Sequence, residues 1–181
     1  HLAMILEKVT QNSGTAPLGV GLDISKEAII MASKEYKNII WCVGDLAGAP
    51  FAGGCFDFIL NILAPANYAE FKRMISPYGR VIKVIPGRDY LKELRDILYE
   101  QTDKQHYSND DTLELFKSNF ALQDVERVHY NVTLDRTWLE PLLQMTPLTW
   151  GATQERLLKA QQEELSHVTI DLTILAGEKH N

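Results

Sequence analysis

Asp23 is the first residue whose place in the sequence points to chemistry. It closes the apolar run Leu18-Gly-Val-Gly-Leu-Asp-Ile-Ser25, which predicts a short strand buried on both faces of a parallel sheet. In open α/β sheets ligands bind where such strands end, and a carboxylate can accept hydrogen bonds from both hydroxyls of a ribose. Asp23 is therefore a candidate ribose anchor. The alternative is that Asp23 only helps Ser25 to cap the helix that follows.

A second acid, Asp45, follows a second predicted strand. Residues 39–43 form another apolar run, and residues 44–51 are too rich in small side chains to be regular. The residues between the two runs have the apolar spacing of a helix that begins after Ser25. The sequence therefore places two carboxylates at the ends of two neighbouring strands.

The rest of the chain continues this alternation of strands and helices. Further strands are predicted at 56–63, 80–85, 120–134 and 167–175, and further helices at 1–8, 68–75, 90–100, 110–118, 137–150 and 153–165. Pro77-Tyr-Gly79 is a predicted turn. The pattern predicts an α/β fold with right-handed crossovers, a mostly parallel sheet and helices on both faces. The apolar alternation in the last two strands predicts an antiparallel pair at the end.

Composition and charge limit the function classes. The 181 residues, 45% of them hydrophobic, predict one domain spanning 1–181. The formal charge of −6 argues against a protein that coats nucleic acid non-specifically, although a local basic patch could hold a structured RNA. Cys42 and Cys55 lie in or next to apolar runs, which predicts reduced, buried thiols in a cytoplasmic protein.

The sequence also gives no indication of a metal site or of a membrane. Neither the two cysteines nor the five histidines have the spacing of metal ligands. There is no apolar run of about 18 residues and no signal-peptide pattern, so neither a membrane nor export is predicted.

The order of these features resembles the class I S-adenosylmethionine-dependent methyltransferases, whose sheet carries acids after its second and third strands and ends in an antiparallel pair. The resemblance implies S-adenosylmethionine as cofactor and S-adenosylhomocysteine as product. It implies that Asp23, with the adjacent Ile24, binds the ribose, and that Asp45, with the backbone of Leu46, contacts the adenine. It also implies that residues 61–65, beginning with Asn61, face the methionine part and the methyl acceptor.

Three motifs resemble the large-subunit ribosomal RNA (guanine-N1)-methyltransferases, and the match covers nearly the whole chain. They are Leu63-Ala-Pro65, Ile85-Pro-Gly87 followed by Tyr90-Leu-Lys-Glu-Leu-Arg-Asp-Ile-Leu-Tyr99, and Leu142-Leu-Gln-Met-Thr-Pro-Leu-Thr-Trp150. The resemblance implies direct transfer of the sulfonium methyl to guanine N1 of a base unstacked from a 23S ribosomal RNA hairpin. At the position of Tyr90 this subfamily can carry a histidine that touches the cofactor. Tyr90 is thus a candidate cofactor contact, or else a ring that packs at a helix start.

The same resemblance gives candidate contacts for the RNA. Asn61, Ala64 and Pro65 would lie near the inserted guanine, with Trp138 or Trp150 as a stacking surface. For both tryptophans, packing against the sheet is the favoured alternative. No residue is assigned as general base.

Arg88, Lys92 and Arg95 have the spacing i, i+4 and i+7, which places three positive charges on one face of the predicted helix. They form a candidate strip for RNA phosphates, and Arg88 and Lys92 are its predicted substrate contacts. The alternative is a solvated helix face, because Glu93 and Asp96 interleave with the cations.

Two parts of the resembled family have no counterpart in this sequence. One is a cysteine-rich N-terminal zinc module, and the other is a first strand that ends in a glycine-rich loop. We therefore expect a piece of a longer enzyme, with zinc only in that module. The missing strand would lie between the strands of Asp23 and Phe56, and a homodimer is one option for the oligomeric state.

Other functions stay open at this point. A small-molecule methyltransferase of the same fold would differ only in its acceptor. In a nicotinamide-dinucleotide domain Asp23 would bind ribose in the same way, but Asp45, Leu63-Ala-Pro65 and the late antiparallel pair speak against it. A fragment that binds no cofactor is the remaining alternative.

Overall fold

The computed structural model describes residues 2–163 and 165–180. The chain divides into two compact units. Unit 1 contains residues 2–55 and 66–76, and unit 2 contains residues 56–65 and most of the chain from residue 77 onward. A single domain spanning the whole chain stays a prediction. No described helix is both long and apolar enough to cross a bilayer.

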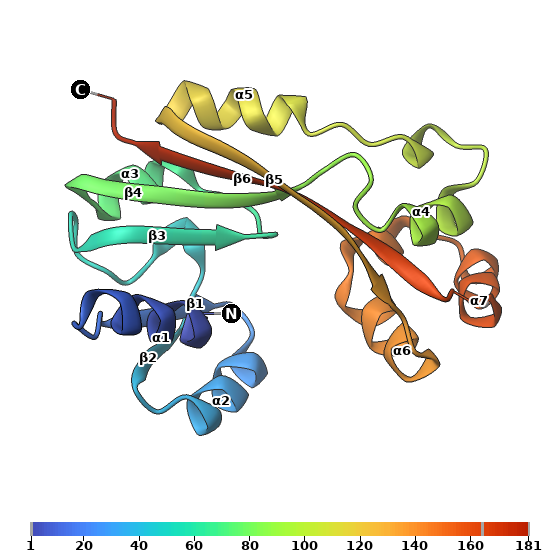
Figure 1. Ribbon diagram of the computed structural model, residues 1–181, viewed down its shortest axis with the longest axis horizontal. Helices are drawn as coiled ribbons and strands as arrows, with labels where there is room; N and C mark the ends of the chain where they lie inside the picture. The colour runs from blue at the N-terminus through green and yellow to red at the C-terminus, as the bar shows by residue number, and fades with distance from the viewer. Residues whose placement is uncertain (1, 164, 181) are drawn as a thin grey trace. The chain divides into compact units, whose positions relative to one another are not determined.

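Unit 1 is built on a parallel pair of strands, β1 (Gly19–Asp23) and β2 (Ile39–Val43) (Figure 1). Its helical elements are α1 (Leu2–Ser13), α2 (Lys26–Glu35), η1 (Leu46–Gly48) and α3 (Tyr68–Met74). Helix α2 begins after Ser25, whose Oγ accepts the Ala28 N–H at 3.2 Å. Gly21 is required where it stands, because a Cβ there would overlap the ring of Trp41 on the paired strand.

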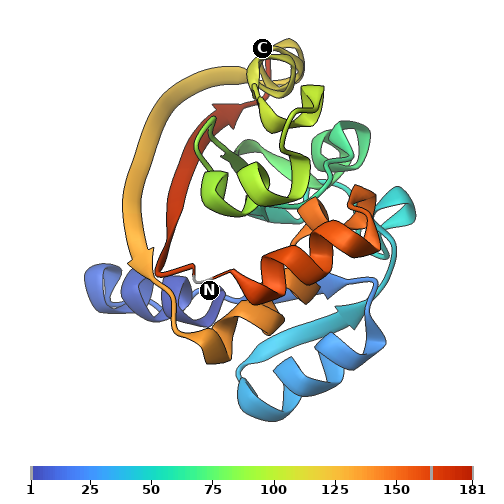
Figure 2. The same ribbon diagram turned by 90° about the vertical axis from the view of Figure 1, so that its right-hand side faces the viewer.

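Unit 2 is built on a four-stranded mixed sheet with the order β3-β4-β6-β5. The strands are β3 (Phe56–Ile62), β4 (Ile75–Pro86), β5 (Ala121–Thr133) and β6 (His167–Glu178). Strand β6 pairs antiparallel with β4 and with β5, and Figure 2 shows β5 as a long curved strand beside β6. The α/β class and the antiparallel pair at the end of the chain are therefore confirmed.

Three helices of unit 2, α4 (Lys92–Tyr99), α6 (Arg136–Met145) and α7 (Gln154–Gln162), share an apolar cluster. The other helical elements of this unit are η2 (Asp103–Gln105), α5 (Asp110–Asn119) and η3 (Pro147–Gly151). Leu94 and Leu98, one turn apart on α4, are fully buried. They pack in one cluster with Leu139 and Leu143 of α6 and Ala160 of α7. The cluster also includes Val168 of β6, so it holds α4 against that strand.

Three local predictions were wrong. Helix α1 extends to Ser13, beyond the predicted end at residue 8. The predicted turn at Pro77-Tyr-Gly79 lies inside β4, where the register with β6 begins only at Arg80, so Pro77 removes no hydrogen bond from that pairing. Helix α4 begins at Lys92 and not at Tyr90, because Leu91 has a left-handed backbone with φ of 50°.

Candidate functional site

Asp23 and Asp45 lie at the carboxyl ends of the two parallel strands of unit 1. The Gly44 N–H, just after β2, donates to the carbonyl oxygen of Asp23 at 3.0 Å. Both carboxylates are exposed. Oδ1 of Asp23 accepts the Ser25 N–H and Oδ1 of Asp45 accepts the Ala47 N–H, each at 2.8 Å. Among the described residues neither second oxygen has a partner, so each acid keeps a free acceptor for a hydroxyl or an amino group.

The two alternatives for Asp23 are therefore compatible. Its Oδ1 orders the backbone of Ser25, which caps α2, while its Oδ2 remains available to a ligand. The side chain of Ile24 is largely exposed, and Leu46 is partly exposed. Apolar surface thus lies next to each acid in the sequence.

Helix α3 holds the segment that follows Asp45. Asn67 caps this helix, with its Oδ1 accepting the Glu70 N–H at 3.2 Å. The Nδ2 of the same side chain donates to the carbonyl oxygen of Leu46 at 3.3 Å. The residue that starts α3 therefore also fixes the backbone beside Asp45.

Arg73 and Glu70 extend this attachment. Arg73 donates to the carbonyl oxygens of Phe51 at 2.6 Å and Ala49 at 2.9 Å. Glu70 accepts the Ala49 N–H at 3.0 Å and pairs with Arg73 at 2.7 Å. The hydrogen bond from Arg73 is the main cause that lowers the pKa of the Glu70 carboxyl below its ordinary value. Glu70 thus remains an acceptor at neutral pH.

In unit 2 the end of β3 carries a strained turn. Leu63 has φ of 49°, a conformation that leucine rarely adopts, and its N–H donates to the carbonyl oxygen of Val84 at 3.0 Å. Asn61 is buried, and its Nδ2 donates to the carbonyl oxygen of Pro65 at 3.0 Å. Ala64 and Pro65 are exposed. Such strain gathers at functional sites, so this turn is a candidate for contact with a ligand.

A buried lysine donates hydrogen bonds to Asn61 and to that turn. Lys83, on β4, is only 4% exposed. Its Nζ donates to Asn61 Oδ1 at 2.5 Å and to the carbonyl oxygen of Ala64 at 3.2 Å. Burial lowers the pKa of the Lys83 ammonium below its ordinary value.

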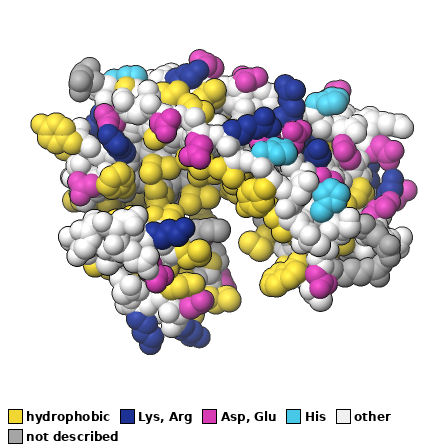
Figure 3. All heavy atoms as spheres, viewed as in Figure 1, with side chains coloured by type: hydrophobic (Ala, Val, Ile, Leu, Met, Phe, Trp, Pro, Cys, Tyr) yellow, Lys and Arg dark blue, Asp and Glu magenta, His cyan; other side chains and the backbone are white. Residues whose placement is uncertain are grey.

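The turn after β4 is fastened to β6 by Asp171, which is fully buried. The Gly87 N–H donates to the carbonyl oxygen of Asp171 at 2.8 Å, and the Asp89 N–H donates to its Oδ2 at 2.9 Å. Arg127 Nε donates to Oδ1 at 2.8 Å, which is the main cause that lowers the pKa of the Asp171 carboxyl. A Cβ on Gly87 would overlap this carboxylate. Figure 3 shows charged and histidine side chains gathered over this part of unit 2.

Arg95 is not part of an exposed basic strip. It is 4% exposed and donates to the carbonyl oxygens of Arg88 at 2.8 Å and Tyr90 at 2.5 Å. Its guanidinium carbon lies 5.2 Å from the centre of the Tyr107 ring. The predicted face is wrong because α4 begins at Lys92 and leaves Arg88 in the preceding turn. From its buried position, Arg95 holds that turn by hydrogen bonds to its carbonyl oxygens.

Arg88 and Lys92 border a cavity of about 560 Å³. Its other lining residues are Asp89, Arg95, Asp96, Gln105, His106, Tyr107 and Ser108. Arg88 and Lys92 are exposed, and within the described residues neither side chain has an ion pair or a hydrogen bond. These two cations are therefore available to an anion.

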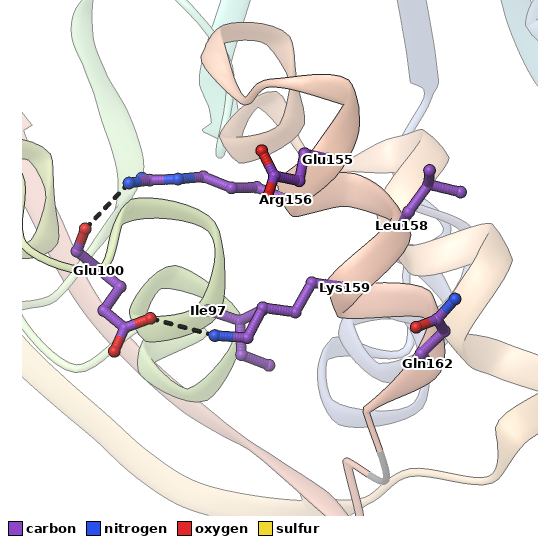
Figure 4. Close-up of a pocket in the computed structure, with 7 residues that line it drawn as sticks. All are labelled: Ile97, Glu100, Glu155, Arg156, Leu158, Lys159 and Gln162. Atoms are coloured by element: carbon purple, nitrogen blue, oxygen red, sulfur yellow. Dashed lines mark hydrogen bonds and ion pairs between the residues drawn. The ribbon is translucent and has the colours of Figure 1, made fainter.

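A second cavity of about 560 Å³ lies between α4 and α7 (Figure 4). Its cations are occupied, since Arg156 donates to the carbonyl oxygens of Leu98 and Glu100 at the end of α4. Lys159 pairs with the Glu100 carboxylate at 3.0 Å. These bonds complete the last turn of α4, and we assign this cavity no ligand.

The remaining candidates have mixed outcomes. Tyr90 is half-buried and packs against the apolar cluster of unit 2, which raises the pKa of its phenol, and its role as a cofactor contact stays a prediction. The prediction that Trp138 and Trp150 pack against the sheet is wrong, because their side chains are 66% and 82% exposed. Both cysteines are unpaired, but the prediction that they are buried is wrong, because Cys42 is partly exposed on β2 and Cys55 is exposed in the loop before β3.

Comparison with known proteins gives related sequences, although no protein-family model matches the chain. The chain is 42% identical over 167 residues to YxjB of Bacillus subtilis strain 168, a proposed 23S rRNA (guanine-N1)-methyltransferase, and the match covers 92% of this chain and 59% of YxjB. It is 28% identical over 176 residues to the 23S rRNA (guanine(748)-N(1))-methyltransferase of Streptomyces fradiae, covering 96% and 61% of the two chains. The chain thus spans about three fifths of the length of these relatives.

Solved structures share its fold. YcgJ from Bacillus subtilis has a TM-score of 0.64 at 16% identity, over 97% of this chain and 88% of that chain. A proposed methyltransferase from Bacillus halodurans C-125 has a TM-score of 0.58 at 13% identity, with the same coverage of both chains. The chain therefore has the α/β fold of these solved structures.

Two charged residues of this chain, Lys83 and Asp171, were assigned no buried role from the sequence. A signal for both exists, because each is a single charged residue inside an apolar strand, Val-Ile-Lys-Val-Ile and Thr-Ile-Asp-Leu-Thr-Ile. A charge at such a position must be paired, hydrogen-bonded or functional. Asn67, Glu70 and Arg73 lie in or next to a short amphipathic helix. Its sequence pattern gives no comparable signal that these side chains bind the loop after Asp45.

Proposed function

We propose that this chain is part of a methyltransferase that transfers a methyl group from S-adenosylmethionine to N1 of a guanine in 23S ribosomal RNA. The observation that carries the proposal is the 42% identity with YxjB over 92% of this chain. A ribosomal RNA substrate implies a cytoplasmic location, which is part of the same proposal.

The residues of unit 1 fit a nucleoside. Asp23 and Asp45 follow adjacent parallel strands, are exposed and keep one free carboxylate oxygen each among the described residues. We assign Asp23, with Ile24, to the ribose, and Asp45, with the backbone of Leu46, to the adenine. The bonds from Asn67 and Arg73 to the loop after Asp45 would keep the adenine contact in place.

The residues of unit 2 are proposed to serve the rest of the cofactor and the guanine. Asn61 and Tyr90 are the proposed cofactor contacts, and the exposed Ala64 and Pro65 would border the base. The bound cofactor supplies a methyl group that is already activated on a sulfonium. The protein must therefore bind the guanine in line, exclude water and take the proton that N1 loses.

A methylation assay tests this function. The full-length protein is incubated with S-adenosylmethionine and a 23S ribosomal RNA hairpin, and the RNA is digested and searched for N1-methylguanosine by mass spectrometry. A panel of small-molecule acceptors is offered in parallel. Methylation of the RNA at guanine N1 is expected, whereas methylation only of a small molecule would contradict the proposed substrate.

The cofactor contacts are tested separately by calorimetric titration with S-adenosylmethionine. Asp23→Ala and Asp45→Ala should each weaken binding about 10-fold or more, because each removes a charged hydrogen-bond acceptor. Asp111→Asn, an exposed acid on α5, is the matched control and should bind as the wild type does. Unchanged affinity in both Asp variants would remove this pair from the site.

A further inference from the structure

Lys83 is a buried cation with no described counter-charge. It lies on an inner strand of the sheet of unit 2 and is 4% exposed. Among the described residues its hydrogen-bond partners are an amide oxygen and a carbonyl oxygen, and no carboxylate pairs with it. A buried ammonium in such surroundings is costly, so a lysine there changes its protonation state readily. The lowered pKa of Lys83 agrees, because burial is its cause.

The two partners of Lys83 orient its nitrogen. A neutral primary amine has two N–H groups and one lone pair. Asn61 Oδ1 at 2.5 Å and the carbonyl oxygen of Ala64 at 3.2 Å can accept from both N–H groups. In the neutral form the lone pair is then the only position of the nitrogen without a described partner. This position can take up a proton.

The same two contacts place Lys83 at the segment proposed to border the guanine. Asn61 is the last residue but one of β3, and Ala64 lies in the turn after this strand, next to Leu63 with its strained backbone. Methyl transfer to guanine N1 needs an acceptor for the N1 proton, and Asp23 and Asp45 are assigned to the nucleoside. Among the described residues, Lys83 is an ionisable side chain that donates a hydrogen bond to this turn.

We propose that Lys83 is the general base that accepts the proton lost from guanine N1, an inference that rests on the proposed function. The neutral amine of Lys83 takes the N1 proton, and the electron pair of the broken N–H bond stays on the ring. N1 forms its bond to the methyl carbon, and the electron pair of the broken carbon–sulfur bond stays on sulfur. The products are N1-methylguanine, a neutral thioether and the ammonium form of Lys83.

The first test measures the protonation of Lys83 without any reaction. The full-length protein, labelled with ¹³C at lysine Cε, is titrated by NMR, and the Lys83 signal is assigned by its loss in Lys83→Arg. Lys83 should titrate at a lower pH than Lys117, an exposed lysine paired with Glu114. A Lys83 signal that titrates together with Lys117, or at higher pH, would overturn the proposal.

The second test is the pH dependence of kcat/KM for hairpin RNA. Lys83→Arg keeps a hydrogen-bond donor for Asn61 and Ala64 but cannot lose its proton, and Lys83→Met removes both properties. Both variants should lose about 100-fold or more at neutral pH, the usual contribution of a general base. The loss should shrink at alkaline pH, where guanine N1 ionises without help. Lys117→Arg is the matched control and should keep the wild-type profile.

The outcomes separate the two proposals. A wild-type protein that methylates no guanine N1 overturns the proposed function together with the role of Lys83. If the wild type is active and Lys83→Arg is equally active, Lys83 is not the base. A folded Lys83→Arg variant whose loss is the same at every pH assigns Lys83 to positioning alone and also overturns the proposal.

Discussion

Two buried ionisable side chains of unit 2, Asp171 and Lys83, are stabilised in different ways. Asp171 accepts hydrogen bonds from the Arg127 guanidinium and from the Asp89 N–H, so its charged form is favoured. Lys83 has only neutral oxygen partners among the described residues, so burial disfavours its charged form. The buried Asp171 therefore stays charged and stabilises the fold, whereas burial of Lys83 favours its neutral form, which can accept a proton.

Asp171→Asn should lower the free energy of unfolding at neutral pH, because the amide loses the charge-assisted bonds to Arg127. The expected loss is on the order of 1 kcal/mol, since Arg127 is over half exposed and water screens the pair. The folded pKa of Asp171 lies below its ordinary value of 3.8, so this contribution is fully present above about pH 4 and disappears as the pH falls through the folded pKa.

Urea unfolding of the wild type and of Asp171→Asn at pH 7 and at pH 3 measures this effect. The difference between the two proteins should be smaller at pH 3. The exposed acid Asp111 provides the control variant, Asp111→Asn, which should differ little from the wild type at either pH. A difference for Asp171→Asn that is equal at both pH values would show that its charge does not stabilise the fold.

At the scale of elements, strand ends carry the candidate groups and neighbouring elements hold the turns that follow. Helix α3 binds the segment after β2 through Asn67, Glu70 and Arg73. Strand β6 binds the turn after β4 through Asp171, and Arg95 of α4 donates to the carbonyl oxygen of Arg88 in the same turn. Each turn thus has a fixed backbone, which a binding site needs.

Arg73→Met should weaken S-adenosylmethionine binding several-fold without touching Asp45. The methionine keeps a long side chain on the helix, but it cannot donate to the carbonyl oxygens of Ala49 and Phe51, so the loop after Asp45 must be ordered on binding. Calorimetry measures the affinity, and Lys34→Met on the exposed part of α2 is the control. If a folded Arg73→Met binds as tightly as the wild type, α3 has no part in ordering the adenine contact.

At the scale of the whole molecule, net charge and local charge have opposite signs. The chain carries a formal charge of −6, and a polyanion such as RNA is repelled by it at long range. Arg88 and Lys92 border the cavity that Tyr107 also lines, and they are exposed cations without described partners. Binding of RNA should therefore depend strongly on these few contacts and on salt.

Replacing Arg88 and Lys92 together by Glu should weaken hairpin RNA binding and reduce the slope of log Kd against log salt by about 2, roughly one for each phosphate that is no longer neutralised. S-adenosylmethionine affinity should not change. The variant Lys34→Glu with Lys37→Glu alters the net charge equally, on the exposed surface of unit 1, and should leave the slope nearly intact. Equal slopes for both double variants would mean that net charge alone governs RNA binding.

The sequence by itself determined the elements and the position of the two acids. Periodicity located β1 and β2 to within one or two residues, and the side chain of Ser25 predicted the start of α2, because these signals depend on residues close in the chain. Since β1 and β2 are parallel neighbours, Asp23 and Asp45 had to reach the same edge. The motifs around Leu63, Tyr90 and Thr146 were likewise sufficient to predict which proteins the chain is similar to.

Only the tertiary structure decided which charges are buried and which are free. Arg95 has the same local spacing as Arg88 and Lys92, yet the packing of α4 buries it beneath the turn that it was expected to flank. Asp171 meets Arg127 across two paired strands, and Lys83 meets Asn61 across two others. Spacing along the chain fixes the face of a helix or strand, but burial and pairing depend on elements that come together only when the sheet forms.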